Sequence, residues 1–134
     1  MNFNLHIVSS DRIFYQGECE SLIVPTNDGL VGILANHSNV IMALIPGQLQ
    51  YRRPNQKDEY CSIGSGMIKV ENNDVLVLID TIERPDEIDE KRARLAVAKA
   101  KEELLQKRSM QEYHMAQAHL QRALSRLKVK SHKK

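Results

Sequence analysis

The sequence has no long apolar run. A transmembrane helix needs about 20 predominantly apolar residues, and no segment of the 134 residues approaches that length. The first residues, MNFNLHIVSSDRIFYQ, also lack the basic region followed by an apolar stretch that is typical of a secretory signal peptide. We therefore expect a protein that is not exported and does not insert directly into a membrane.

Cysteine is scarce, and the common catalytic motifs are missing. Cys19 and Cys61 are the only cysteines and do not form a CxxC pair, so we expect two free thiols in a reducing compartment. The sequence contains no GxxxxGK[ST], no HExxH and no GxSxG. Its histidines are scattered, and a lone histidine is more often a surface or core residue than a ligand. We expect no enzyme, no catalytic residue and no metal site.

Charge is present but unevenly distributed. Residues 1–84 hold 6 Lys and Arg against 10 Asp and Glu, whereas residues 85–134 hold 13 against 7. A basic second part predicts an acidic partner, which can be nucleic acid, phosphate groups or an acidic protein surface. A basic helical hairpin that binds nucleic acid is therefore one candidate. Tyr113 is the only aromatic residue of this part, so it lacks side chains on which bases could stack, which disfavours that function.

The first part, residues 1–84, has the pattern of short β-strands. Phe3, Leu5 and Ile7 alternate with other residues at a period of two. In GMIKVENNDVLVLID, residues 66–80, two β-rich runs flank an Asn-Asn pair that tolerates the left-handed conformation of a tight hairpin turn. Such strands with regular turn signals predict a small antiparallel β-sandwich or barrel.

The second part, residues 85–134, has the pattern of two helices. Pro85 can begin the first helix, and either Asp86 or Asp89 can cap it. Its apolar residues recur at spacings of three and four: Ala93, Ala96, Ala100 and Leu104. We expect these Ala-rich faces to pack as an antiparallel hairpin. Because the hairpin has few large apolar residues, it should be marginally stable alone and able to leave its resting place.

A second helix is predicted after residue 109. Ser109-Met110-Gln111-Glu112 has the spacing of a capping box, which starts a helix. The apolar stripe that follows consists of Tyr113, Ala116, Leu120, Leu124 and Leu127.

The segment DGLVGILANHSNVIMALIPGQL, residues 28–49, has two interpretations. The simpler one is two strands with a connection. The functional one is that the connection at Asn36, His37 and Ser38 contacts a partner, since exposed loops often carry function.

Four segments follow one another in an order that resembles the epsilon subunit of bacterial rotary ATP synthase. They are GLVGILANH, the LIPGQL turn, IGSGMIKVENNDVLVLID and EIDEKRA. The resemblance covers essentially the whole chain and implies an N-terminal β-sandwich followed by a helical hairpin. It also implies a non-catalytic rotor subunit of a proton- or sodium-translocating enzyme, bound peripherally at the cytoplasmic face of the inner membrane. In this family the sandwich docks on the gamma subunit and the polar loops of the c-ring. The hairpin can fold beside the sandwich or extend to the beta and alpha subunits, where it restrains ATP hydrolysis.

The resemblance assigns two sets of partner-binding residues. Asn36, His37 and Ser38 correspond to the loop that faces the c-ring, although the family often has Gly where this chain has Asn36. The basic residues of the second helix are expected to engage an acidic surface of beta when the hairpin extends: Arg122, Arg126, Lys128 and Lys130.

Some members of the family bind regulatory ATP through an [IL]DxxRA motif, which is complete here. The corresponding residues are Ile88, Asp89, Arg92 and Ala93, together with the upstream acid Glu83, the paired Arg122 and Arg126, and Lys99 in place of an arginine. Folding the hairpin would bring these cations together around a triphosphate, with Ile88 and Ala93 offering an apolar surface to adenine. The simpler interpretation is a helix N-cap with an exposed Asp89–Arg92 pair. ATP is thus expected as a regulatory ligand, and no cofactor is required.

Overall fold

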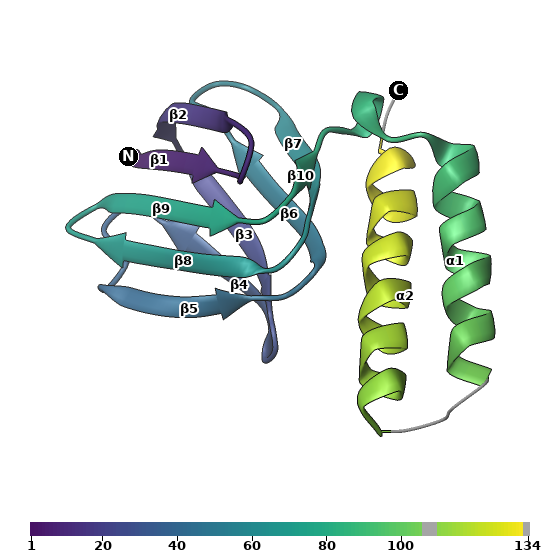
Figure 1. Ribbon diagram of the computed structural model, residues 1–134. Helices are drawn as coiled ribbons and strands as arrows, with labels where there is room; N and C mark the ends of the chain where they lie inside the picture. The colour runs from purple at the N-terminus through teal and green to yellow at the C-terminus, as the bar shows by residue number, and fades with distance from the viewer. Residues whose placement is uncertain (106–109, 133–134) are drawn as a thin grey trace.

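The computed structural model describes residues 1–105 and 110–132, which form a β-sandwich followed by a helical hairpin (Figure 1). The strands are β1 (Phe3–Val8), β2 (Ile13–Cys19), β3 (Ser21–Thr26), β4 (Gly29–Leu34), β5 (Val40–Leu44), β6 (Gly47–Arg52), β7 (Asp58–Ile63), β8 (Gly66–Glu71), β9 (Asp74–Ile79) and β10 (Ile82–Glu83). A 3₁₀ turn, η1 (Pro85–Glu87), leads into the helices α1 (Glu90–Leu105) and α2 (Met110–Lys130). The predicted fold class is confirmed.

Two five-stranded sheets form the sandwich. Their strand orders are β2-β1-β9-β8-β5 and β10-β7-β6-β3-β4. The pairing is antiparallel except between β1 and β9, which run parallel. The sequence predicted an antiparallel arrangement because its turn signals concern neighbouring strands. β1 and β9 are far apart in the chain, so no tight turn constrains their relative direction.

The space between the two sheets is filled by the alternating apolar residues. Phe3, Leu5 and Ile7 are all buried, as their spacing predicted. Both cysteines are free thiols inside this core. Burial raises the pKa of the Cys61 thiol to about 12, so this group stays protonated and unreactive at neutral pH.

The predicted turn between β8 and β9 is also confirmed. Asn72 and Asn73 have φ angles of 50° and 65°. Two successive left-handed residues form the tight hairpin turn whose twist matches that of the flanking strands, and asparagine tolerates this conformation well.

Helix α2 lies between the sandwich and α1, with its inner side on β6 and β7 (Figure 1). Its contact with α1 uses small residues, among them Ala93, Ala100 and Ala123, which let the two backbones approach closely. α2 therefore has two buried sides, whereas the sequence predicted one apolar stripe. Leu124, placed in that stripe, remains 45% exposed. Ser125 is buried instead, because it faces the sandwich.

The start of α1 decides between the two predicted caps. Asp89 is the cap: its carboxylate accepts the backbone N–H of Arg92 at 3.2 Å, and its carbonyl accepts the N–H of Ala93 at 2.9 Å. Asp89 therefore contacts the backbone of Arg92 and not its guanidinium. The capping box predicted at Ser109 lies outside the described residues. Neither helix, over its described part, combines the length and apolar character needed to cross a membrane.

Candidate functional site

Antiparallel packing of α1 on α2 brings two rows of charged residues to one flank of the hairpin. Glu103 of α1 lies 3.3 Å from the Nδ1 atom of His119 on α2. Arg92 and Lys99 precede Glu103 at helical spacing, and Arg122 and Arg126 follow His119 in the same way. Because Glu103 and His119 meet, the rows to which they belong face the same side of the hairpin.

The register of the helices interleaves these cations. Ala93 shares a buried cluster with Val129, and Glu103 lies opposite His119. Both contacts fit one antiparallel register of the two helices. In this register Arg126 lies, along the helix axis, between Arg92 and Lys99. Arg122 follows just beyond Lys99, so the four cations occupy about 10–15 Å of helix length at a rise of about 1.5 Å per residue. We call Arg92, Lys99, Arg122 and Arg126 the flank cations.

Only one flank cation is neutralised by a carboxylate in the described part of the chain. The Nε atom of Arg126 lies 2.7 Å from Oε1 of Glu83, and its Nη2 donates to Oε2 at 3.1 Å. This pair joins α2 to β10. Its side chains are only 28% and 31% exposed. No described residue forms an ion pair with Arg92, Lys99 or Arg122. The arrangement leaves an excess of positive charge, which favours an anion.

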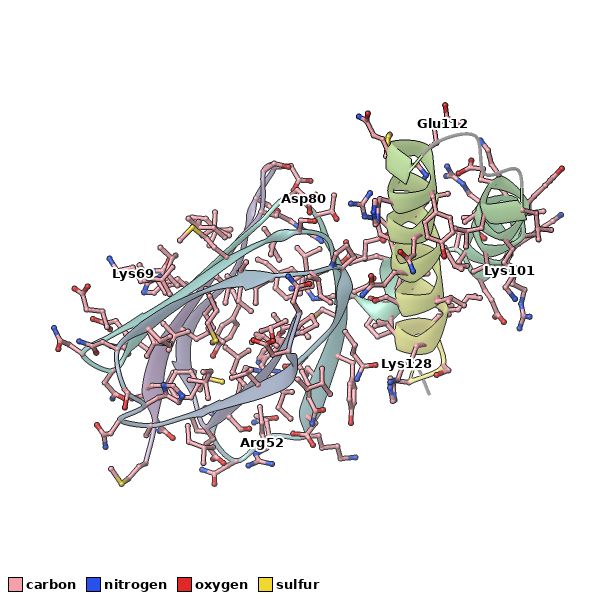
Figure 2. The ribbon with its side chains drawn as sticks, turned by 90° about the horizontal axis from the view of Figure 1, so that it is seen from below. Arg52, Lys69, Asp80, Lys101, Glu112 and Lys128 are labelled. Carbon is pink, nitrogen blue, oxygen red and sulfur yellow. The ribbon has the colours of Figure 1, made fainter. Side chains whose placement is uncertain are left out.

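Arg122 and Arg126 also border a cleft of about 510 Å³ between α2 and the sandwich. The sandwich side contributes three acidic residues, Asp11, Asp80 and Glu83. Figure 2 shows Asp80 at the edge of the sandwich that faces α2. These carboxylates disfavour an anion deep in the cleft, so a polyphosphate fits better on the α1 side of the two arginines. The guanidinium of Arg122 has no carboxylate partner among the described residues, so it can still pair with an anion.

The apolar pair of the motif lies inside the hairpin in this conformation. Ile88 is 2% exposed and Ala93 is fully buried, in a cluster with Val129 and Leu127. Their side chains fasten the base of α1 to α2. An adenine ring could reach them only if this cluster opened, so the flank cations, and not the apolar pair, form the accessible part of the candidate site.

Polar contacts hold α2 on the sandwich. The Oγ atoms of Ser62 and Ser125 lie 3.2 Å apart in the buried contact. Near the end of α2, Lys130 donates its Nζ proton to the carbonyl of Pro85 at 3.2 Å. Lys130 is therefore engaged in this conformation, whereas Lys128 is exposed beside the sandwich (Figure 2).

His132, which belongs to no motif of the sequence, anchors the end of the hairpin. Its ring stacks on Tyr60 with centroids 3.9 Å apart and planes 9° from parallel. Its Nε2 atom lies 3.1 Å from the side-chain oxygen of Gln48. Because both partners are more than seventy residues away in the chain, no local pattern could have identified this contact.

The loop at Asn36, His37 and Ser38 lies at the opposite end of the sandwich from the hairpin. Asn36 has a φ angle of 63°, the left-handed conformation that glycine adopts readily and that asparagine also tolerates. Its backbone N–H donates to the side chain of Asn73 at 2.7 Å, which places the loop beside the β8–β9 turn (Figure 1). The Nδ1 atom of His37 lies 2.8 Å from the carbonyl oxygen of Ser38. The loop is thus polar, with Asn36 and Ser38 exposed.

The sandwich has a second exposed surface, which was not predicted from the sequence. On the outer face of the sheet that contains β1, Val8 pairs with Ile13 on one side and with Leu78 on the other, and Leu78 pairs with Met67. We call Val8, Ile13, Met67 and Leu78 the outer apolar row. Ile13 is 66% exposed, and α2 covers the other sheet. Apolar residues at the outward positions of β1, β2, β8 and β9 were the available signal.

Among the described residues, no group of three or more His, Cys, Asp and Glu side chains is arranged to hold a metal ion.

Comparison with known proteins gives matches along the whole described fold. Residues 2–85 match the family model "ATP synthase, Delta/Epsilon chain, beta-sandwich domain", and residues 86–131 match "ATP synthase, Delta/Epsilon chain, long alpha-helix domain". The ATP synthase epsilon chain of Caldicellulosiruptor bescii is 36% identical over 127 residues, covering 95% of this chain and 92% of that protein. The ATP synthase epsilon chain of Caldanaerobacter subterraneus subsp. tengcongensis is 40% identical over 130 residues, covering 96% and 94%. A chain of the Euglena gracilis mitochondrial ATP synthase, solved as an OSCP/F1/c-ring assembly, shares the fold with a TM-score of 0.84, covering 98% of this chain and 82% of that chain at 21% identity.

Proposed function

The chain belongs to the ATP synthase delta/epsilon family, and on this basis we propose that it is a non-catalytic central-stalk subunit of a proton- or sodium-translocating ATP synthase. In this role it couples the catalytic head to the membrane ring, and its two helices restrain ATP hydrolysis. It associates peripherally with the cytoplasmic face of the bacterial inner membrane through its partner subunits.

The sandwich is the part that docks in the assembly. The outer apolar row is suited to the gamma subunit, because exposed apolar side chains gathered on one face are typical of a protein interface. The polar loop at Asn36, His37 and Ser38 is suited to the polar loops of the c-ring. The two surfaces are separate from the hairpin contact, so the sandwich can keep its partners while the hairpin moves.

The hairpin acts as a brake when it leaves the sandwich. The observation that carries this proposal is the ion pair between Glu83 and Arg126, which occupies a cation of α2 while the hairpin lies on the sandwich. Lys130 is occupied in the same way by the carbonyl of Pro85. Release of the hairpin frees both cations, which can then join Arg122 and Lys128 in engaging an acidic surface of the beta and alpha subunits.

ATP binds the folded hairpin and opposes its release. Its phosphates lie along the flank cations, which are brought together only while α1 and α2 are paired. Arg122 and Arg126 cannot hold phosphates and engage beta at once, so the two states compete for the same charges. A ligand at 100 times its dissociation constant stabilises the state that binds it by about 2.7 kcal/mol, which is enough to reverse the preference of a marginal hairpin. When the ATP concentration falls, the hairpin would thus leave the sandwich and inhibit ATP hydrolysis, which preserves the remaining nucleotide.

Reconstitution of an ATP synthase with the full chain and with a chain ending at residue 108 tests the proposal. We expect both to co-purify with the enzyme, because the sandwich carries the docking surfaces, and the shortened chain to give faster ATP hydrolysis. Equal hydrolysis rates would refute the brake, and failure of both chains to co-purify would refute the role in the central stalk.

A further inference from the structure

The short segment between the sandwich and the hairpin is fastened to the sandwich by one arginine. The guanidinium of Arg12, in the β1–β2 connection, donates two hydrogen bonds to the carboxylate of Glu87, at 2.9 and 3.0 Å. It also donates to the carbonyl oxygen of Ile82 in β10 at 3.0 Å. A two-pronged contact of this kind fixes the orientation of the carboxylate as well as its distance.

Glu87 in turn closes the turn that contains it. Its carboxylate accepts the backbone N–H of Arg84 at 2.9 Å, and its own N–H donates to the carbonyl of Arg84 at 3.0 Å. The guanidinium of Arg84 lies 4.1 Å from the ring centroid of Phe14, a buried residue of the sandwich core. Hydrogen bonding from Arg12 lowers the pKa of the Glu87 carboxyl, which is therefore ionised at neutral pH. Pro85–Glu87 is thus bound to the sandwich at both of its ends.

Lys130 of α2 also donates to the carbonyl of Pro85 in this turn, but side chains pack into the hairpin core only from Ile88 onward. The side chain of Ile88 is buried against Ala93 and Val129, so it belongs to the hairpin core. Asp89 caps α1. The backbone at Ile88 is extended, with φ and ψ of −90° and 124°, and separates η1 from α1.

We propose that Arg12 and Glu87 make Pro85–Glu87 a part of the sandwich and place the hinge of the hairpin at the Glu87–Ile88 junction. This hinge lies three residues beyond the Arg84–Pro85 boundary that the sequence predicted. The inference rests on the proposed release of the hairpin. Glu83 stays with the sandwich when the hairpin moves, whereas Asp89 and Arg92 move with α1.

Backbone order parameters measured by NMR on the isolated full chain test the hinge. Ser125→Arg introduces a large charged side chain into the buried contact between α2 and the sandwich and forces the hairpin off. In this variant we expect residues 84–87 to keep order parameters near 0.85, the value of rigid backbone, and Ile88 and Asp89 to fall below about 0.6. A loss of order that begins at Arg84 would overturn the proposal.

A second variant separates the effect of the Arg12–Glu87 contact from the general stability of the sandwich. Glu87→Gln, added to Ser125→Arg, keeps Arg12 and the sandwich core but removes the charge that joins them to the turn. We expect order parameters of residues 85–87 to fall below about 0.6 in the double variant, while those of β1 and β9 stay unchanged. Asp86→Asn in the same background is the matched control, because it removes a neighbouring charge of the same turn but leaves the Arg12–Glu87 contact in place, and it should leave residues 85–87 ordered. Unchanged order parameters after Glu87→Gln would refute the proposal that the Arg12–Glu87 contact holds the turn on the sandwich. Neither measurement uses ATP or the assembled enzyme, so failure of the hinge and failure of the proposed function are distinguishable.

Discussion

Arg122 offers the sharpest test of ATP binding at the flank cations. In the folded chain no described carboxylate pairs with its guanidinium. Arg126, by contrast, already has Glu83 at 2.7 Å and must share or exchange that partner when a phosphate arrives. Arg122 therefore gains more from a bound phosphate than Arg126 does. We expect Arg122→Ala to weaken ATP binding more than Arg126→Ala.

The size of the effect follows from the type of contact. A hydrogen bond to a charged group contributes about 1.5–3 kcal/mol, which corresponds to a loss of about 10- to 150-fold in affinity for Arg122→Ala. Arg126→Ala also removes the contact that holds α2 to β10, but its net loss on the nucleotide side is smaller because Glu83 is released at the same time.

Isothermal titration calorimetry of the isolated chain with ATP measures both variants. Arg94→Ala is the matched control: Arg94 has the same chemistry, lies on the opposite flank of α1 and pairs with Glu90 at 2.8 Å. Its affinity should equal that of the wild type, and circular dichroism should show equal helix content in all variants. No heat of binding for the wild type would refute the ATP site. A folded Arg122→Ala chain that binds like the control would refute its location.

Three further predictions follow from single contacts. Lys99→Arg should tighten ATP binding several-fold in the same titration, since a planar guanidinium can hold a phosphate with two hydrogen bonds, whereas Lys101→Arg on the outer side should not. Asp89→Ala should destabilise the hairpin by about 0.5–2 kcal/mol through loss of the N-cap, seen as a lower helical melting temperature with no such change for Asp86→Ala. The stability that Glu87 contributes should depend on pH. Its pKa is lowered in the folded chain, so the contribution is present above the usual pKa of a glutamate and is lost as the pH falls through the lowered value. As the pH is lowered from about 6 to about 3, the difference in unfolding midpoint between wild type and Glu87→Gln should therefore shrink. A difference independent of pH would contradict the stabilising role of the ionised Glu87.

The sequence determined the elements of this protein and much of their local chemistry. The alternation of Phe3, Leu5 and Ile7 and the turn at Asn72 and Asn73 depend on residues within a few positions of one another, and local sequence narrowed the cap of α1 to Asp86 or Asp89. Such patterns act through backbone sterics and local hydrogen bonds, which are nearly the same in any fold. The order of successive motifs along the chain was also enough to indicate the family.

The tertiary structure alone decided which residues meet. The parallel pairing of β1 with β9, the burial of Ile88 under Val129 and the contact of His132 with Tyr60 join segments that are distant in the chain. The same is true of the two pairs that control the hairpin. Glu83 neutralises Arg126 across 43 positions, and Arg12 holds Glu87 across 75. Sequence spacing could place the flank cations on one face of each helix, but it could not tell which cation was already paired. That depends on how α2 docks on the sandwich, because a charge is neutralised by whatever lies within a few ångströms, however far away it is in the sequence.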